Sequence, residues 1–456
     1  MQLMKAPPYD EALGMFFYAS SSKLPRGLIR RKPEDFAVFE VIRPGIIVKD
    51  YSPTLEQLLT SGAGLFLWYL LKKRNIDQTR AIYIVAKRLN ITPSKISYAG
   101  IKDTRAVTHQ LISILLDNRR IERMRYMNIS GPHGLLLELK LLGRNHVRIS
   151  PSHGMGNQFI VVIRNVAMSG ADVTQLICKI MQEVIPIGGI PAYFGYQRFG
   201  TIRPNTHLVG KNILKGDYEA AIMELIAREY PYESQHTKDV RREFREKRDP
   251  KGILRRFPRH LVYERQVLRA LAKDPKDYER ALRALPLTIR NLFIQAYQAY
   301  LFNKLLSRRL SIGLTFREVV DGDLVVNMHG EVMVVRDGEV NRIQKMMDEG
   351  KVKLCCRIIG YDYKLHNSYM GELEKELLEE EGINADLFRL HKGIFKPQRG
   401  SIRPAVMNVH RMNLRVLNDC HEPDAVAMSF YLEKGMYASI VLRELLKPKI
   451  PPLVGF

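Results

Sequence analysis

One carboxylate in this sequence stands in a setting that suits chemistry. Asp103 follows a short apolar segment that ends at Gly100, and Lys102 and Arg105 flank it. A side chain at the exit of a strand can be held rigidly and still meet a substrate. Nearby cations favour the ionised form of a carboxyl group, which acts as a nucleophile or a base. On the residues alone a solvated turn is the simpler interpretation, and both stay open at this point.

Five motifs stand in order along the chain. They are Pro33–Phe36, Ala99–Asp103, Gly156–Phe159, Tyr193–Gly200 and Gly435–Ala438. Together they resemble the signatures of the TruD family of tRNA pseudouridine synthases, in its archaeal type. A single motif of this length says little, whereas five in order, spread over most of the 456 residues, are specific.

The resemblance implies an enzyme that isomerises a uridine of tRNA to pseudouridine, with uridine 13 (U13) as the target. The reaction breaks the bond between uracil N1 and the ribose, turns the base and rejoins it through C5. Nothing is oxidised and no group is donated, so we expect no cofactor and no metal. Asp103 matches the family's catalytic aspartate and is expected to act as nucleophile or as proton acceptor; the sequence does not decide between these roles.

The resemblance also implies residues that hold the extruded base. Phe159 and Tyr437 match positions of active-site aromatics, and a base between flat or apolar side chains is stabilised by stacking. Core packing is an equal alternative for Phe159 taken alone. Asn157 carries both a donor and an acceptor, which suits a uracil edge or the geometry of a loop.

Cations are expected beside the catalytic carboxylate. Arg30 stands at the spacing before Pro33–Phe36 where relatives carry a lysine, with Arg31 and Lys32 next to it. Arginine can hold a carboxylate through two hydrogen bonds, so the role survives this change. Which of the three cations faces Asp103 stays open. Lys102 is expected to contact the substrate.

The overall charge points to a polyanionic partner. Lysine and arginine number 71 against 48 aspartates and glutamates, which gives +23 and a pI near 9.8. Nucleic acid is the common partner of such a chain, here tRNA. Cationic clusters that converge in space would suit a folded RNA; the segment 238–247 also fits a helix face with ion pairs. The clusters are residues 72–74, 119–125, 238–247, 255–256 and 308–309.

Several features indicate a soluble, cytoplasmic protein, which we expect to be a monomer. The sequence contains no apolar run long enough for a membrane-spanning helix. Residues 1–10 lack the apolar region of a signal peptide. The four cysteines show no metal-ligand spacing, and we interpret them as buried, reduced thiols.

The hydrophobic pattern indicates an α+β fold. Strands mix with helices without strict alternation up to residue 190, and helices dominate from there to about residue 310. Glu372–Glu381 is predicted as an acidic, solvated helix. Strands are predicted at 27–43, 64–73, 135–142, 159–166, 403–409 and 425–432, with a strand pair at 319–335 that reverses at His329–Gly330. Helices are predicted at 77–89, 171–184, 217–230, 261–285, 287–310 and 436–446.

This order predicts a domain inserted into another. We expect a mixed-sheet catalytic domain of the pseudouridine synthase type, formed by residues 1–190 and 400–456. The family resemblance implies that the interruption, residues 191–399, is a largely helical α+β TRUD domain.

Two other functions compete with this interpretation. A non-catalytic RNA-binding or assembly factor could keep the same fold, although a retained Asp103 with Phe159 argues against it. A different RNA-modifying enzyme, such as a methyltransferase, is disfavoured. Its cofactor needs a glycine-rich loop between a strand and a helix, and neither Gly62–Gly64 nor Gly154–Gly156 has that context.

Overall fold

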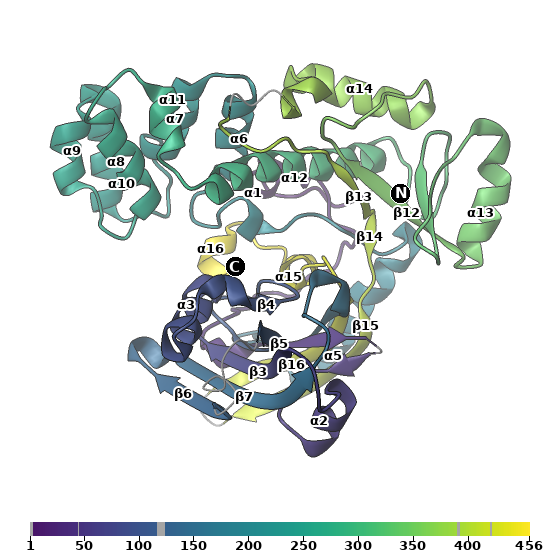
Figure 1. Cartoon of the computed structure of the whole chain (residues 1–456). Coiled ribbons are helices and arrows are strands. Elements are labelled where there is room, and N and C mark those ends of the chain that lie inside the picture. Colours follow the sequence, from purple (N-terminus) through teal and green to yellow (C-terminus); the bar gives the residue numbers. More distant parts are fainter. Residues whose placement is uncertain (1–2, 44, 116–123, 390–392, 420–421) are drawn as a thin grey trace.

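The computed structural model describes residues 3–43, 45–115, 124–389, 393–419 and 422–456. Two parts of the molecule face each other in Figure 1. One contains a large mixed sheet, and the other is built around the long helix α12 (Leu287–Ser311). The large sheet draws strands from both ends of the sequence, which Figure 1 shows as purple to blue and yellow arrows.

Within the described residues the large sheet has ten strands in the order β15-β16-β8-β1-β5-β3-β7-β6. In addition, β2 pairs with β1 and β4 pairs with β5. Neighbouring strands are antiparallel, except that β1 and β5 are parallel. The strands are β1 (Phe36–Ile42), β2 (Ile46–Ile47), β3 (Phe66–Arg74), β4 (Ile96–Tyr98), β5 (Val107–Leu115), β6 (Tyr126–Ser130), β7 (Leu136–Asn145), β8 (Gly154–Ile163), β15 (His410–Asp419) and β16 (Glu422–Glu433).

The centre of this sheet brings distant motifs together. On β1, Val38 stands opposite Phe159 of β8 and beside Thr108 of β5. On the other side of β8, Phe430 of β16 stands opposite Phe159. The motif before β1, the motif in β8 and the loop that leads into β5 therefore lie side by side.

Helices cover this sheet where local signals predict them. Helix α3 (Gln78–Leu89) begins after Asp77, whose side chain accepts a hydrogen bond from the Arg80 backbone N–H. It ends at Asn90, which adopts the left-handed conformation common at helix ends. Its apolar face packs with residues of β3 and β7. The other helices of this part are α2 (Pro53–Leu59), α5 (Gly170–Glu183), α15 (Ala438–Leu446) and α16 (Pro451–Val454).

The second part of the molecule is organised around α12, against which α6, α14 and β12 pack. At one end, α7 to α11 form a helical lobe, shown at the left of Figure 1. The helices are α6 (Thr206–Leu214), α7 (Tyr218–Ile226), α8 (Gln235–Lys247), α9 (Pro250–Arg256), α10 (Val262–Leu271), α11 (Tyr278–Arg283), α13 (Val340–Asp348) and α14 (Tyr369–Glu381). Among the described helices, none is long and apolar enough to cross a membrane.

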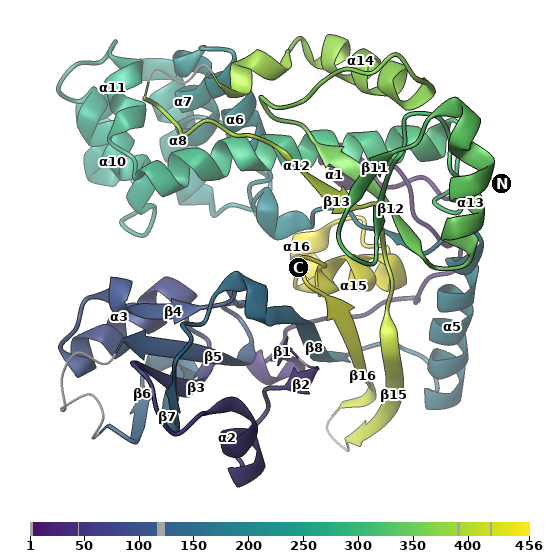
Figure 2. The ribbon, with the colours of Figure 1, turned by 45° about the vertical axis from the view of Figure 1, so that its right-hand side comes forward.

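A small sheet lies beside α12 at the other end, and α13 flanks it in Figure 2. Its strands follow the order β11-β10-β12-β13 and are all antiparallel. They are β10 (Leu324–Asn327), β11 (Val332–Val334), β12 (Val352–Ile358) and β13 (Ser401–Pro404). A further short antiparallel pair is formed by β9 (Ile190–Pro191) and β14 (Val406–Met407). It links the two segments in which the chain passes from one part of the molecule to the other.

The N-terminal segment joins the two parts. It contains the short helix α1 (Pro8–Glu11), and Asn303 and Ser307 of α12 donate hydrogen bonds to the carbonyl oxygens of Leu13 and Gly14 at 3.0 and 2.7 Å. Nearby, Asp10 is fully buried and pairs with Arg443 of α15 at 2.6 Å. The first residues of the chain are therefore fixed between α12 and α15.

Among the elements that differ from the sequence prediction, three have a clear local cause. The strand predicted at 27–43 is confined to β1, because Pro33–Asp35 forms the short 3-10 helix η1. The segment predicted as helical at 261–285 is two helices, α10 and α11, because Pro275 interrupts it. The sequence analysis does not predict the edge strand β15. Its exposed face carries the polar side chains of Arg411, Asn413 and Arg415.

Helix α14 has the solvated acidic face that its sequence predicts, at Glu372, Glu376, Glu379 and Glu380, but two of its glutamates point inward. Both Glu374 and Glu381 are buried. Glu381 accepts hydrogen bonds from Lys211 of α6 at 2.6 Å and from Lys304 of α12 at 2.8 Å. The hydroxyl of Tyr297 donates a third at 3.0 Å. The carboxylate at the end of α14 thus ties three helices together.

Several cationic clusters serve the fold rather than a surface. Lys73, Arg241 and Arg309 are fully buried. Arg309 pairs with Asp323 at 2.6 Å, and Arg241 pairs with Glu233 at 2.9 Å. Lys73 and Arg309 of the clusters 72–74 and 308–309 therefore offer no charge to an RNA, because their charges are used inside the protein.

The alternative interpretation of residues 238–247, a helix face with ion pairs, is confirmed. On α8, Arg242 and Arg245 pair with Glu229 at 2.6 and 3.0 Å. Lys247 pairs with Glu243 one turn before it at 3.1 Å. Residues 119–123 of the predicted cluster 119–125 lie outside the described residues.

The cysteine prediction holds for two of the four residues. Cys355 and Cys356 on β12 are buried. Cys178 is exposed, because the buried side of α5 is formed by residues such as Ile177 and Ile180. Cys420 lies outside the described residues.

Candidate active site

A cavity of about 510 Å³ lies where the sequence motifs converge. Its wall is formed by the segment before β1, the loop between β4 and β5, strand β8 and the start of α15. All six site residues that the sequence predicts are part of its wall. These residues are Arg30, Lys102, Asp103, Asn157, Phe159 and Tyr437.

Asp103 is held firmly and stays accessible. Its side chain is 22% exposed. The Oδ1 atom accepts hydrogen bonds from Nη2 of Arg30 at 2.9 Å and from Nε2 of Gln197 at 3.2 Å. A hydrogen bond from a guanidinium to a carboxylate is charge-assisted and favours the ionised acid. Among the described residues none donates to Oδ2, so this oxygen is available to a substrate.

Arg30 is the cation that faces Asp103. It is buried, whereas its neighbours Arg31 and Lys32 are exposed. Its guanidinium lies 4.1 Å above the ring of Phe36, so the cation has an aromatic support on the side away from water. Burial lowers the pKa of Arg30, and the Asp103 carboxylate opposes this shift. An arginine remains protonated in such a setting, so Arg30 presents a permanent charge.

The backbone at Arg30 adopts an uncommon conformation that aims its side chain. Its φ angle is +54°, in the left-handed region that costs a non-glycine residue roughly 1–2 kcal/mol. Such conformations concentrate at functional sites, where the surrounding structure fixes them. Here the neighbouring Ile29 is fixed, because its N–H donates to the Val454 carbonyl at 2.9 Å.

Lys102 lines the cavity, but its charge is already paired. Its ammonium donates to Oε1 of Glu40 on β1 at 2.7 Å, and both side chains are buried. The other oxygen of Glu40 accepts from the Leu111 backbone N–H at 3.0 Å. This pair joins the Asp103 loop to β1 and β5. Contact between Lys102 and the substrate stays a prediction.

Phe159 packs in the core and also lines the cavity, and its contact with a base stays a prediction. It is 4% exposed and packs against Phe430 at 5.5 Å between ring centroids and against Phe36 at 6.0 Å. The same ring forms part of the cavity wall. It therefore extends the apolar core of the sheet to the cavity surface.

Asn157 lines the cavity, and one of its polar atoms has no partner among the described residues. Its Oδ1 is buried and finds no hydrogen-bond donor among the described residues. Such an atom costs free energy unless a partner arrives, so it is suited to receive a donor from a ligand. The residue before it, Gly156, is a glycine for a steric reason. A Cβ at this position would lie 2.1 Å from the Leu432 carbonyl oxygen of β16.

Tyr437 closes another side of the cavity. It is half-buried, stands immediately before α15, and its ring lies 6.0 Å from that of Phe194. The guanidinium of Arg403 lies 5.4 Å from the Tyr437 ring and 4.4 Å from the Phe194 ring. Burial lowers the pKa of Arg403 to about 10, which leaves it charged at neutral pH.

Sequence reasoning missed three residues around Asp103. Gln197 lies within the motif Tyr193–Gly200 but has no special local signal. Glu40 is a carboxylate on the same strand face as Phe36 and Val38, and this face is apolar otherwise; that break in the pattern was the available signal. Lys73 is one of three consecutive cations, and nothing in the sequence marks the middle one as buried.

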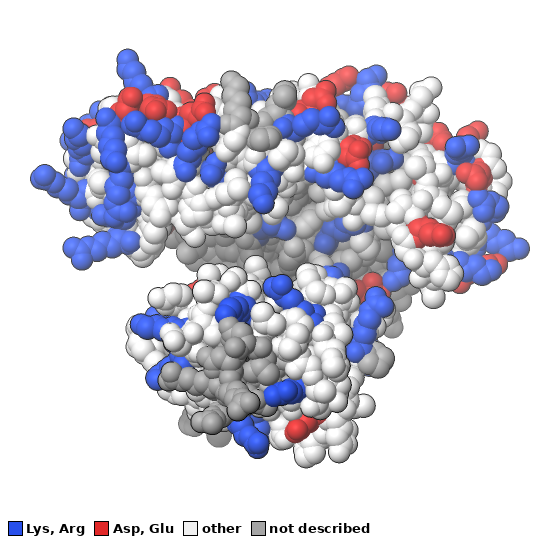
Figure 3. All heavy atoms as spheres, in the orientation of Figure 1, with Lys and Arg blue, Asp and Glu red and all other residues white. Residues whose placement is uncertain are grey.

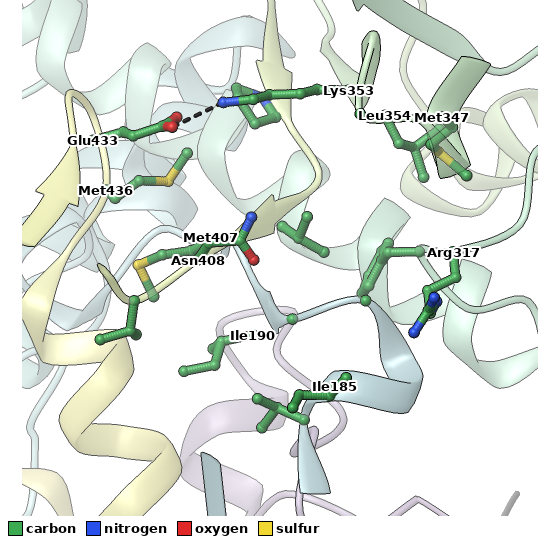
Figure 4. A pocket seen from close by; sticks show the side chains of 18 of the residues that line it. Ile185, Ile190, Arg317, Met347, Lys353, Leu354, Met407, Asn408, Glu433 and Met436 are labelled. Carbon is green, nitrogen blue, oxygen red and sulfur yellow. Dashed lines mark hydrogen bonds and ion pairs between the residues drawn. The ribbon is translucent and has the colours of Figure 1, made fainter. Parts of the chain in front are cut away.

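A second cavity, of about 590 Å³, lies at the junction of the two parts. Figure 4 shows methionines at its wall, among them Met347, Met407 and Met436. Glu433 at its edge is paired with Lys353 at 2.8 Å. Met436 belongs to the wall of both cavities, so only a thin partition separates them here. This second cavity contains none of the predicted site residues.

The surface around the junction is cationic. In Figure 3, lysine and arginine side chains lie on both sides of the hollow between the two parts. Acidic side chains stand mainly toward the outer edges of this face. A hollow bordered by cations suits a polyanion.

The comparisons with known proteins identify the family. A family model described as tRNA pseudouridine synthase D (TruD) matches residues 12–445. Relatives named "Probable tRNA pseudouridine synthase D" include one from Methanosarcina acetivorans, 32% identical over 98% of each chain. Another, from Pyrococcus abyssi, is 34% identical over 92% of this chain and 96% of its own.

A solved structure shows the same fold. The crystal structure of a Methanosarcina mazei protein described as tRNA pseudouridine synthase D superposes with a TM-score of 0.77. Its sequence is 30% identical, and the match covers 99% of this chain and 100% of that one. The fold and the site thus define a pseudouridine synthase, which is an isomerase. The chain belongs to the TruD family of tRNA pseudouridine synthases.

Proposed function

We propose that this protein converts uridine 13 of tRNA to pseudouridine and that Asp103 is its catalytic carboxylate. The observation that carries this proposal is the position of Asp103 in the cavity. One of its oxygens is held by Arg30 and Gln197, and the other has no donor among the described residues. The family to which the chain belongs supports the substrate class, and the resemblance of its motifs supports the position in tRNA.

The cavity supplies what an isomerisation of a nucleotide needs. A base in a folded RNA is stacked, so the target uridine must leave the stack before its glycosidic bond can react. Phe159 and Tyr437 offer aromatic surfaces to the extruded base. The unpaired Oδ1 of Asn157 can accept the N3–H of uracil, which a cytosine lacks.

Asp103 then has one of two roles. As a nucleophile its carboxylate attacks C1′ of the ribose while the bond to N1 breaks, and the ester so formed breaks when C5 bonds to C1′. As a base it removes a ribose proton while the same bond breaks, and this proton returns to the ribose when C5 bonds to C1′. In either case the base turns, the C5 proton leaves and N1 takes up a proton, so the product is an isomer of the substrate. The guanidinium of Arg30 holds one oxygen of the carboxylate in place before the reaction begins.

The direct experiment uses unmodified tRNA transcripts and maps pseudouridine at nucleotide resolution. We expect modification at U13 and none in a transcript in which cytidine replaces U13. Modification at another uridine would refute the assignment of position but not the activity. If no uridine in tRNA is modified by the folded protein, the proposed activity itself is wrong.

A further inference from the structure

A buried lysine lies directly behind the Asp103 loop and takes no part in the steps above. Lys73 is the next-to-last residue of β3, and none of its surface is exposed. Its ammonium lies 2.5 Å from the Asp103 carbonyl oxygen, 3.0 Å from that of Ile76 and 3.3 Å from that of Lys102. The three N–H groups of the ammonium therefore meet three backbone carbonyls.

This match depends on the charge of Lys73. An ammonium has three donors and no acceptor. A neutral amine has two N–H groups and a lone pair, so one of the three carbonyls would face a lone pair and be repelled. Two of the carbonyls belong to Lys102 and Asp103 themselves. The charge state of Lys73 therefore acts on the backbone that carries the catalytic carboxylate.

We propose that Lys73 is a positioning residue whose ammonium fixes the Asp103 loop in its reactive geometry. It touches no substrate, since it lies beneath the loop and is fully buried. It acts by holding the Asp103 backbone while Arg30 and Gln197 hold the side chain. This role rests on the proposed function of Asp103.

The environment of Lys73 brings its pKa into a pH range in which the protein can be assayed. Burial lowers its pKa to about 8 from the ordinary 10.5. Asp103 of the loop and Asp77 at the start of α3 raise the pKa, and Lys102 lowers it. Between pH 8 and 10.5 the unfolded chain keeps a proton that the folded protein loses. The contribution of Lys73 to folding stability therefore increases with pH in this range. A loss of activity there is local and does not come from unfolding caused by Lys73.

The kinetic test compares the parent protein with Lys73→Met under single-turnover conditions from pH 6.5 to 9.5. The parent rate should fall above about pH 8, with tRNA affinity unchanged. Lys73→Met should be about 100-fold slower at pH 7, the typical cost of a small misplacement of a catalytic group. Its rate should show no comparable fall above pH 8. A Lys73→Met protein that keeps the parent rate and the parent pH profile overturns the proposal.

A structural test works without any activity. Trypsin can cut after Arg105, which is exposed in the same loop, and after Lys215, which is exposed far from it. In Lys73→Met the cut after Arg105 should be at least several-fold faster, with the cut after Lys215 unchanged. Equal acceleration at both sites means general destabilisation and overturns the positioning role. If the parent shows no pseudouridine formation but the loop is selectively loosened, the proposed function fails while the link between Lys73 and the loop stands.

Discussion

The Asp103 carboxylate depends on two donors of unequal strength, and their removal should have unequal effects. Arg30 brings a buried charge, whereas Gln197 brings a neutral amide at a longer distance. We expect Arg30→Ala to lower the single-turnover rate by about 10- to 150-fold. This factor corresponds to about 1.5–3 kcal/mol for a hydrogen bond to a charged group. Gln197→Ala should cost about tenfold or less. The measurement is pseudouridine formation with enzyme in excess, with circular dichroism to check folding. A larger loss for Gln197→Ala would contradict the order of the two donors.

At the level of single residues, the sequence identified the residues that line the cavity better than the buried residues that hold them in place. Asp103, Asn157 and Phe159 carry a recognisable motif context, and the structure brings them to one cavity. The role of Lys73 could not be predicted, because burial of one cation among three depends on the packing of β3 between β5 and β7. Local sequence does not contain that information.

At the level of elements, Glu381 makes a testable contribution to the attachment of α14. Burial alone raises the pKa of a carboxyl group, but hydrogen bonds from Lys211 and Lys304 outweigh it and hold the Glu381 pKa at about 2. The ordinary value is 4.5, so this stabilisation is present above pH 4.5 and is lost as the pH falls toward 2.

We therefore expect Glu381→Gln to be less stable than the parent at pH 7, with a difference that shrinks as the pH falls below 4.5. Urea unfolding of both proteins across this range measures it. Glu372→Gln, at an exposed position at the start of the same helix, is the matched control and should follow the parent. A pH-independent difference for Glu381→Gln would contradict the assigned ion pairs.

Elements with complete local signals were predicted well. The helix expected at 77–89 is α3, because Asp77 caps it and Asn90 ends it. The segment expected at 159–166 belongs to β8, which begins earlier at Gly154. Strand β15 lies at the edge of the sheet, and among the described strands it pairs with β16 alone. Its exposed polar residues hide the pattern that a half-buried strand shows.

For the whole molecule, we propose the division that the sequence suggested, with residues 1–190 and 400–456 as one domain and 191–399 as an insertion, except that β13 (Ser401–Pro404) belongs to the small sheet of the second part. Its support is that β16 pairs with β8 along eight residue pairs and that α15 stands next to the cavity. Removal of all residues after 400 should therefore abolish cooperative unfolding of the N-terminal half, because β8 and Phe159 lose their cover. Circular dichroism during urea unfolding of the truncated chain checks this. A sharp transition that includes residues 1–190 would contradict the division.

The helical lobe offers a test of how the whole molecule meets tRNA. Arg269, Lys273, Arg280 and Arg283 line a hollow between α10 and α11, where Arg280 and Arg283 pair with Asp277 and Glu279. We expect Lys273→Glu to weaken tRNA binding severalfold. The slope of log affinity against log salt concentration should decrease by the amount expected for the loss of about one phosphate contact. Lys345→Glu, on α13 at the opposite end of the second part in Figure 1, is the matched control. Filter binding at several salt concentrations measures both. Equal effects would mean that the lobe has no special role.

The most direct test of the account is the Asp103→Asn variant. The change keeps the shape of the side chain and removes its charge and basicity, which either catalytic role requires. The measurement is tritium release from tRNA labelled at C5 of uridine, with enzyme in excess, beside filter binding of the same protein. We predict tRNA binding within a few-fold of the parent and no detectable release. Release at a rate near that of the parent would contradict the assignment of Asp103 as the catalytic carboxylate.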